Sequence, residues 1–230
     1  MQTVKNKDIV SHWLRKKGWV LFKHQEDVLI KINSKKNILL ISPTGTGKTL
    51  SAFLPSIVDL EKNSMKNVLH TLYISPLKSL TYDIEKNIIQ SIKEININTD
   101  IQARTGDTGH SKKKNQLLKP PSILMTTIES FALLMSEKSS TNFFKNVKFV
   151  IIDEIHSFLN TKRGELLSLN LARLNKISKN HKKIMLSATI KDCDDASRYF
   201  CSKKAFVIAA ETQKKIKVKI LSKTDDIPWS

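Results

Sequence analysis

Ser42-Pro-Thr-Gly-Thr-Gly-Lys-Thr49 is the stretch that decides the fold of this 230-residue chain. An apolar run at residues 37–41 precedes it and a helix-like stretch at residues 50–54 follows it, which gives the order strand, tight loop, helix. Gly45 and Gly47 let the backbone approach a polyphosphate, and the start of the helix adds a partial positive charge at the same place. The sequence therefore predicts a phosphate-binding loop.

Two side chains of this loop have separate expected roles. Lys48 can reach the β- and γ-phosphates of a nucleotide, and the Thr49 hydroxyl can hold Mg²⁺. Ser42 stands where the strict loop pattern has glycine, so the alternative is a glycine-rich turn between a strand and a helix. A Thr-Gly-x-Gly-Lys-Thr string arises by chance at only about 10⁻⁶ per position, which favours the nucleotide-binding interpretation. The other residues expected to surround the phosphates are Thr44, Gly45, Thr46 and Gly47.

Strand-like and helix-like segments alternate along the rest of the chain. Helical patterns are expected at residues 8–17, 25–32, 83–95 and 164–177. Strands are expected at residues 37–41, 70–75, 100–104, 122–126, 149–153, 183–187 and 205–209. This alternation predicts an α/β fold with a mostly parallel sheet and helices on both faces. Ligands of such sheets bind at the carboxyl ends of the strands.

An apolar strand ends in two adjacent carboxylates, Asp153 and Glu154. In a magnesium-dependent nucleotide hydrolase one carboxylate helps to hold the metal and the next orients or activates the attacking water. Acidic residues at a strand end are common, so the interpretation depends on the phosphate loop being present as well. Ser187 and Thr189 end another apolar strand and can hydrogen-bond to His156, although a plain strand-to-helix turn explains them equally well.

The composition points to a polyanionic partner without deciding it. The chain has 39 basic and 21 acidic residues, a net charge of +18, which suggests nucleic acid. Only five of the basic residues are arginine, and a lysine-rich surface from an AT-rich coding sequence explains the rest as well. No apolar stretch reaches the roughly 18 residues of a membrane span. Cys193 and Cys201 match no disulfide framework or metal spacing, so a reduced, cytoplasmic protein without membrane contact is expected.

Taken in order, residues 42–49, Asp153-Glu-Ile-His156 and Ser187-Ala-Thr189 resemble motifs I, II and III of superfamily 2 helicases of the DExH group. Further matches narrow the resemblance to the large helicase-related (Lhr) family and to the ligase-associated DExH helicases of bacterial DNA repair. These matches are Lys17-Gly-Trp19, Ser75-Pro-Leu-Lys-Ser-Leu80, Arg104-Thr-Gly-Asp-Thr108, Thr126-Thr-Ile-Glu-Ser130 and Lys162-Arg-Gly164. The resemblance covers nearly the whole chain.

This resemblance implies a RecA-like, three-layer fold and a role for each matched position. Gln25 would read adenine, and His156, Ser187 and Thr189 would couple hydrolysis to strand movement. Ile128 stands where the family usually has proline. The residues that would lie along the single-strand track, where they contact successive phosphates, are Pro76, Leu77, Lys78, Thr105, Gly106, Asp107, Thr126, Thr127 and Glu129.

The resemblance also implies a division of labour with a second lobe. Residues 1–225 would form the ATP-binding lobe, and residues 226–230 would begin the linker to a second RecA-like lobe outside this chain. That lobe supplies an arginine finger, which is worth about 10³-fold or more in turnover. We therefore expect binding of ATP and Mg²⁺, weak hydrolysis and no unwinding by this chain alone.

The implied nucleic acid is single-stranded or partly duplex DNA, and the implied partners are a DNA ligase or a nuclease of a repair system. Three alternatives remain at this point: an RNA helicase lobe, a degenerate basic fragment that binds nucleic acid without activity, and a small-molecule kinase. The kinase is the least favoured, because nothing in the sequence resembles an arginine-bearing lid.

Overall fold

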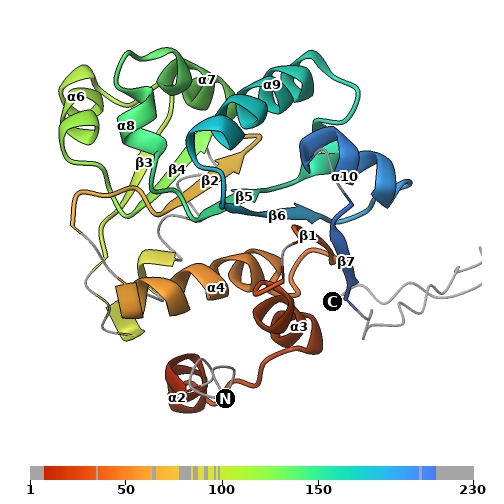
Figure 1. Ribbon diagram of the computed structural model, residues 1–230. Helices are drawn as coiled ribbons and strands as arrows, with labels where there is room; N and C mark the ends of the chain where they lie inside the picture. Colours follow the sequence, from red (N-terminus) through yellow and green to blue (C-terminus); the bar gives the residue numbers. More distant parts are fainter. Residues whose placement is uncertain are drawn as a thin grey trace, which may run out of the picture.

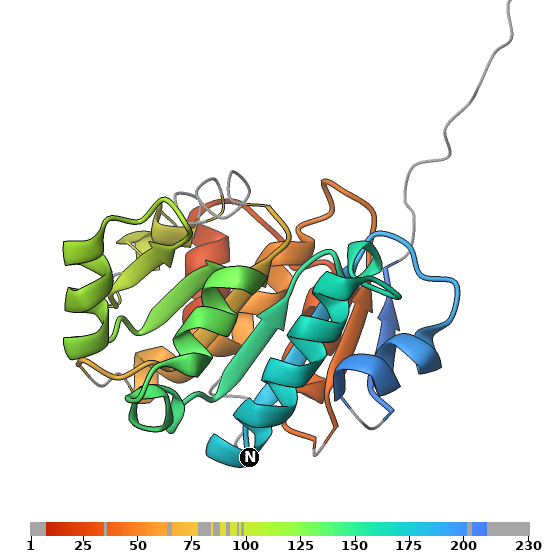
Figure 2. The ribbon, with the colours of Figure 1, turned by 90° about the horizontal axis from the view of Figure 1, so that it is seen from above.

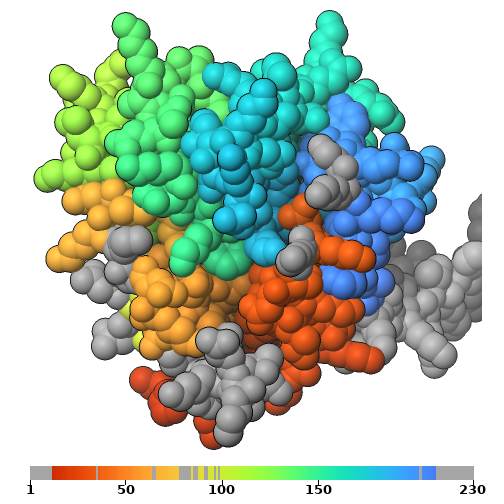
Figure 3. All heavy atoms as spheres, viewed as in Figure 1, coloured from red at the N-terminus to blue at the C-terminus, as the bar shows by residue number. Residues whose placement is uncertain are grey.

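A computed structural model describes residues 8–34, 36–63, 66–77, 84, 88–90, 93–95, 97, 99–201 and 204–210. Within this part of the chain a central sheet is covered on both faces by helices (Figure 1). With all atoms drawn as spheres, green-to-blue residues of the later chain form most of the upper part of the face in view, and red-to-orange residues of the earlier chain form most of the lower part (Figure 3). The expected linker at residues 226–230 lies outside the described residues.

The sheet has seven strands in the order β3-β4-β2-β5-β6-β1-β7, and every neighbouring pair is parallel. Its strands are β1 (Ile38–Ile41), β2 (Thr71–Ser75), β3 (Ile101–Arg104), β4 (Ile123–Thr127), β5 (Phe149–Ile152), β6 (Lys182–Ser187) and β7 (Phe206–Ala209). Each expected strand forms, with bounds within one residue of the prediction. The α/β prediction is therefore confirmed, and the sheet is wholly parallel within the described residues.

The helices form two layers (Figure 1). One layer contains α2 (Asp8–Lys16), α3 (Lys23–Lys31) and α4 (Lys48–Asn63). The other contains α6 (His110–Leu118), α7 (Ile128–Ser136), α8 (Ser140–Phe144), α9 (Lys162–Ile177) and α10 (Cys193–Cys201), with the short 3₁₀ turn η1 (Ile155–Ser157) after β5. Seen from above, α7 and α9 lie side by side across the sheet (Figure 2).

Each face of the sheet builds its own hydrophobic core. Successive strand residues point to opposite faces, so Leu39 packs beneath α7 and α9 while Ile38 and Leu40 pack against α3 and α4. Because both faces are covered, strands such as β2, β4 and β5 are buried along their whole length. This explains why their sequences are apolar runs rather than alternating patterns.

The expected helix at residues 83–95 is only partly described. Residues 84, 88–90 and 93–95 are helical, and Ile84 and Ile88 are buried in the core beside α4. Ile95, at the same helical spacing, packs against this core, and Ile92 lies outside the described residues. In the part of the chain that the structure describes, no helix is long and apolar enough to cross a membrane.

Candidate functional site

The carboxyl ends of all the strands meet at one edge of the sheet (Figure 2). The loop 42–49 follows β1, Asp153 follows β5, and Ser187 ends β6. These three strands are neighbours in the order β5-β6-β1. The expected strand-track residues lie at or just after the ends of β2, β3 and β4, on the other side of β5. The sheet order thus divides this edge in two, and we name the parts the nucleotide half and the nucleic-acid half after the roles that the sequence predicts.

The loop 42–49 takes a conformation that its glycines permit. Gly45 and Gly47 have φ angles of +80° and +75°, a region that other residues rarely adopt. Thr46 Oγ1 donates to the Pro43 carbonyl at 2.7 Å, and it is also hydrogen-bonded to the Ser42 hydroxyl. The serine that replaces the expected glycine therefore cross-links the loop. Thr44 lies exposed at the loop tip and Thr49 is half-buried in the first turn of α4.

Helix α3 braces this loop from behind. Gln25 is buried, its Oε1 accepts from the Phe22 N–H at 3.0 Å, and its Nε2 lies 3.5 Å from the Gly47 carbonyl. His24 Nε2 donates to the Thr46 carbonyl at 3.1 Å, and burial lowers the pKa of His24 below its usual value. A side chain at Gly47 would place its Cβ 2.7 Å from Gln25 Nε2. Gln25 thus lies against the loop, and its expected contact with adenine stays a prediction.

Lys48 and Glu154 form an ion pair across the nucleotide half. Lys48 Nζ lies 2.8 Å from Glu154 Oε1, and the lysine is only 6% exposed. Glu154 has a φ of +50°, a left-handed conformation that costs free energy in a non-glycine residue and tends to occur at functional sites. Its second oxygen, Oε2, is buried without a hydrogen-bond partner, although His156 Nδ1 lies 3.3 Å away.

Asp153 is almost completely buried between two donors. Tyr73 donates its hydroxyl to Oδ2 at 2.6 Å, and the Glu154 N–H donates to Oδ1 at 2.8 Å. Burial, with the charge of Glu154, raises the pKa of Asp153 above its usual value, while Tyr73 and Lys48 oppose the rise. Tyr73 carries no sequence signal as a site residue, because it lies in an apolar strand like a core residue, and it does stack on Phe53.

His156 and Ser187 are in contact, as the sequence suggested. Ser187 Oγ donates to the Thr189 carbonyl at 2.7 Å. Its own hydrogen is therefore used, so His156 Nδ1 is the donor in the 3.0 Å bond to Ser187 Oγ. Thr189 joins this chain of contacts through its backbone. Together with Lys48 and Glu154, these residues form a continuous polar line from β1 to the end of β6.

In the nucleic-acid half, hydrogen bonds among residues 104–113 hold the loop after β3 in its conformation. The Thr105 N–H donates to Thr108 Oγ1 at 2.9 Å, and Lys113 Nζ donates to the Gly106 carbonyl at 2.9 Å. Arg104 is buried and donates to the Lys113 carbonyl, and burial lowers the pKa of its guanidinium. Gly106 and Asp107 are left exposed at the tip of this loop.

The two threonines that end β4 face inward. Thr126 is buried and donates to the Arg104 carbonyl at 2.7 Å, which ties the end of β4 to the end of β3. Thr127 caps α7 by accepting from the Ser130 N–H at 3.4 Å. Ile128, in place of the family's proline, is fully buried in the core. The positions of these side chains favour a role in shaping the loop.

Arg163, at the start of α9, joins two of the expected track segments. Its Nε donates to Glu129 Oε1 at 2.7 Å and its Nη2 donates to the Pro76 carbonyl at 2.9 Å. Burial would raise the pKa of Glu129, but the bond with Arg163 holds it below its usual value. Leu77 is exposed beside them, and Lys78 lies outside the described residues. The only sequence signal for Arg163 was its place in the Lys162-Arg-Gly164 match.

The donor set suits a magnesium ion carried by a nucleotide. Among the described residues, no three histidine, cysteine or carboxylate side chains cluster as a metal site. Mg²⁺ needs no such cluster, because it usually binds through one or two carboxylates, several waters and the phosphates. Asp153 retains free lone pairs on both oxygens, and the Thr49 hydroxyl lies in the adjacent first turn of α4.

Comparisons with known proteins agree with this geometry. Residues 22–196 match the DEAD/DEAH box helicase family. The ATP-dependent helicase Lhr-Core of Methanocaldococcus jannaschii is 39% identical over 237 residues, covering 96% of this chain and 28% of that protein. The Lhr-Core of Sulfolobus acidocaldarius is 37% identical over 202 residues, covering 83% of this chain and 23% of that protein. The chain therefore spans about a quarter of these relatives.

Solved structures give the same result. The helicase Lhr of Mycobacterium smegmatis, bound to single-stranded DNA and AMP-PNP, matches with a TM-score of 0.80 and 30% identity over 89% of this chain and 28% of that one. The DEAD-box helicase Mss116, bound to single-stranded RNA, matches with a TM-score of 0.72 at 22% identity, over 85% of this chain and 41% of that one, which supports the fold alone. The RecA-like fold implied by the resemblance is confirmed. The chain belongs to the DEAD/DEAH box helicase family and forms one RecA-like helicase domain of the Lhr type.

Proposed function

We propose that this chain is the ATP-binding lobe of a DExH-box DNA helicase, which binds ATP with Mg²⁺ at one half of the carboxyl edge and single-stranded DNA at the other. The observation that carries the proposal is the Lys48–Glu154 ion pair, which brings a buried cation and a carboxylate together beside a glycine loop. A buried charge requires a partner. Lys48 and Glu154 are that partner for each other.

Binding of a nucleotide would exchange this ion pair for contacts with phosphate. Lys48 would turn from Glu154 to the β- and γ-phosphates, and the N–H groups of the loop 44–47 and of the first turn of α4 would surround them. Glu154, relieved of Lys48, would then accept the proton of the attacking water. The unpartnered Glu154 Oε2 supports this role, because it leaves an acceptor available at the site.

Thr49 and Asp153 would hold the Mg²⁺ ion, which when bound neutralises phosphate charge. The raised pKa of Asp153 supports this assignment, since burial disfavours its negative charge and a nearby cation would stabilise that charge. Gln25 would face the adenine, with His24 fixing the loop from the same helix.

The polar line Lys48–Glu154–His156–Ser187 would report the state of the nucleotide. A change at the phosphates moves Lys48 and Glu154, and His156 contacts both Glu154 and Ser187. The position of His156 between these groups supports its proposed coupling role. Thr189 would take part through the carbonyl that Ser187 binds.

We propose slow turnover by this chain alone. Hydrolysis by related enzymes uses an arginine finger. Of the chain's five arginines, Arg104, Arg163 and Arg173 donate to groups far in sequence from the loop 42–49. A second RecA-like lobe would supply the missing cation, and unwinding would require it too.

The loops after β2, β3 and β4 would bind the nucleic acid, through exposed backbone and side chains of residues 76–77, 105–107 and 127–129, and Lys78 would add a positive charge. We propose DNA as the strand, because the similar Lhr structure is bound to single-stranded DNA. Titration of labelled oligo-dT and oligo-U of equal length tests this choice. By resemblance, the wider proposal is a cytoplasmic repair helicase that acts with a DNA ligase or a nuclease.

One feature of the structure favours the alternative function, a basic fragment that binds nucleic acid through its positive charge alone. A hollow of about 270 Å³ near the opposite edge of the sheet is lined by Lys145, Lys148 and Lys179 and by no carboxylate. Lys148 is already paired with Asp59 at 2.8 Å, which reduces the positive charge there. Binding at this hollow would weaken steeply with salt and would ignore ATP.

Replacing Asp153 with asparagine is expected to weaken Mg²⁺-dependent nucleotide binding by about 10- to 100-fold, the usual cost of disturbing the surroundings of a bound metal. The thermal stability of the Asp153→Asn variant should not be lower than that of the unsubstituted chain. Burial raises the pKa of Asp153, so its ionised form costs folding free energy at neutral pH, and Asp153→Asn removes that cost. Calorimetric titration with AMP-PNP, with and without Mg²⁺, measures the first effect and thermal melting the second.

Asp194→Asn is the matched control, since Asp194 is a partly exposed carboxylate on α10 that pairs with Lys204 at 2.6 Å, in a helix outside the loop 42–49. It should leave nucleotide binding unchanged. Unaltered Mg²⁺-dependent binding in Asp153→Asn would contradict the assignment of the metal site.

A further inference from the structure

One guanidinium connects two segments of the nucleic-acid half. Arg163 uses two different nitrogens for them: Nε for Glu129, in the first turn of α7, and Nη2 for the Pro76 carbonyl, in the loop after β2. Strands β2 and β4, which precede these segments, are neighbours in the sheet, and Ser75 pairs with Thr127 at their ends. Arg163 therefore fixes the spacing between the loop after β2 and the start of α7, at the point where both leave the sheet.

The contacts depend on the shape of the arginine head group. A planar guanidinium presents donors in two directions at once, and an ammonium is a point charge that cannot reproduce this fork. The Arg163 head group also lies over the Phe158 ring, 5.7 Å from its centroid. The pose is thus held by three independent neighbours from three segments of the chain.

The same residue is anchored to the nucleotide half by a short, rigid turn. Phe158, just after η1, is fully buried. Thr161 Oγ1 donates to the Phe158 carbonyl at 2.8 Å and accepts from the Gly164 N–H at 3.1 Å. Gly164 packs so closely that an added Cβ would lie 2.0 Å from the Phe158 carbonyl oxygen. Because these contacts join the segment after β5 to the start of α9, a shift of Asp153 or Glu154 would also move Arg163.

We infer that Arg163 is a positioning residue that holds the loop at Pro76 and the first turn of α7 at Glu129 in the spacing required by a single strand, and links them to the carboxylate segment after β5. This inference rests on the proposed function and adds to it a residue with no contact to nucleotide. Arg163 already donates to Glu129 Oε1 and to the Pro76 carbonyl, so the guanidinium acts through these two groups.

Direct binding of a phosphate by Arg163 is the competing role, since the side chain is 44% exposed. The two roles differ in their salt dependence. Loss of one phosphate contact lowers the slope of log affinity against log salt by about 0.7 for a single strand. Loss of a positioning contact weakens binding at every salt concentration and leaves that slope unchanged.

The test is fluorescence anisotropy of a labelled oligo-dT titrated with the full chain and with Arg163→Met, at several salt concentrations. Arg163→Met keeps the aliphatic stem and removes both hydrogen bonds, and we expect about tenfold weaker binding with an unchanged salt slope. Arg163→Lys should weaken binding as well, because a lysine restores the charge without the fork.

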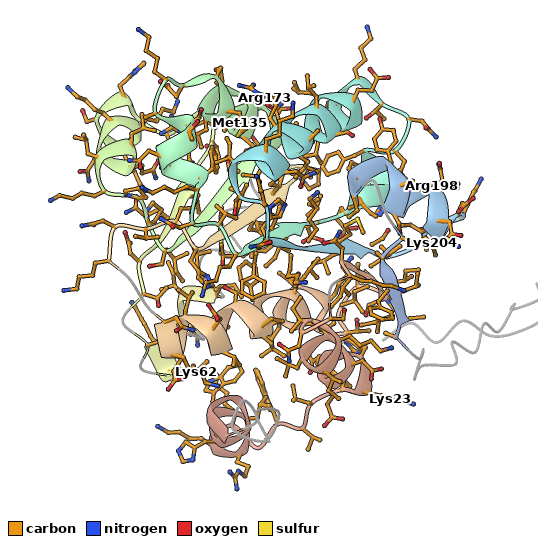
Figure 4. The ribbon with its side chains drawn as sticks, in the orientation of Figure 1. Lys23, Lys62, Met135, Arg173, Arg198 and Lys204 are labelled. Atoms are coloured by element: carbon orange, nitrogen blue, oxygen red, sulfur yellow. The ribbon has the colours of Figure 1, made fainter. Side chains whose placement is uncertain are left out.

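Arg173→Met is the matched control. Arg173 lies on the same helix, carries the same charge and donates to a backbone carbonyl, that of Met135 at the end of α7, at 2.7 Å (Figure 4). The Arg173→Met substitution removes the same charge and a similar hydrogen bond, at a place away from the proposed nucleic-acid strand. Its affinity for oligo-dT should therefore change less than about twofold. AMP-PNP affinity without DNA should be equal in all variants, which also verifies that they are folded.

The outcomes separate this inference from the proposed function. The positioning role would be overturned if the Arg163→Met variant bound oligo-dT as tightly as the unsubstituted chain. It would also be overturned if the Arg163→Lys variant bound oligo-dT with full affinity. A salt slope reduced by about 0.7 in Arg163→Met alone would replace it with a direct phosphate contact. Absence of oligo-dT binding by the unsubstituted chain would overturn the proposed function and this inference together.

Discussion

Replacing Lys48 with methionine is expected to weaken binding of Mg²⁺ and AMP-PNP by about 10- to 100-fold, the cost of a lost hydrogen bond to a charged group. Lys48 is the buried cation of the nucleotide half, and its present partner is Glu154 at 2.8 Å. Lys48→Met retains the aliphatic stem within its packing and removes the charge that would meet the phosphates. Equilibrium titration with a fluorescent AMP-PNP derivative measures the loss.

The chain offers a matched control in Lys183, a second buried lysine. Its Nζ donates to Asn175 Oδ1 at 2.9 Å, and burial lowers its pKa. Lys183→Met therefore removes a buried ammonium of the same kind from β6 without touching the loop 42–49. Nucleotide affinity should remain as in the unsubstituted chain. Equal affinity in Lys48→Met and Lys183→Met would contradict the phosphate-binding role of Lys48.

Replacing Gly164 with alanine is expected to destabilise the chain by about 3 kcal/mol or more, at the upper end of the range for overpacking. The added Cβ would lie 2.0 Å from the Phe158 carbonyl oxygen and 2.9 Å from its carbonyl carbon, both backbone atoms that cannot rotate away. For a chain of this size the corresponding fall in melting temperature is about 6–12 °C. Thermal unfolding followed by circular dichroism measures it.

Gly109→Ala controls for the loss of glycine itself, because an added Cβ at Gly109 meets nothing within 4 Å. Its effect should stay below about 1 kcal/mol. If both variants melted at the same temperature, the close approach of α9 to the Phe158 backbone would be wrong. The position of Arg163 would then lose its structural support as well.

Most of the fold was predictable because a parallel sheet covered on both faces leaves a direct trace in the sequence. The strands are apolar runs, and each forms within one residue of the expected bounds. Helix ends were less certain. Helix α9 begins at Lys162 rather than Gly164, because Thr161 caps it by accepting from the Gly164 N–H. The loop 42–49 was recognisable because its spacing reflects a local geometry.

Apart from the contact between His156 and Ser187, the side-chain contacts that complete the site were not predictable, because they depend on the order of the strands. Alternation of strands and helices does not specify the order β3-β4-β2-β5-β6-β1-β7. Only that order brings Tyr73 against Asp153, 80 residues away, and Arg163 against Pro76, 87 residues away. In the same way, the inward hydrogen bond of Thr126 requires β3 beside β4. The type of residue at a strand end therefore predicted that its side chain lies at the carboxyl edge of the sheet. It did not predict which residue that side chain contacts.

Hydrogen–deuterium exchange of the chain, alone, with Mg²⁺ and AMP-PNP, and with oligo-dT, tests most directly whether nucleotide and strand occupy adjacent halves of one edge. The account predicts that AMP-PNP slows exchange at residues 42–50 and 153–157, and that oligo-dT slows it at residues 76–77, 105–109 and 127–130. Protection by oligo-dT confined to residues 145–148 and 177–180, at the lysine-lined hollow, or no protection of residues 42–50 by AMP-PNP, would contradict it.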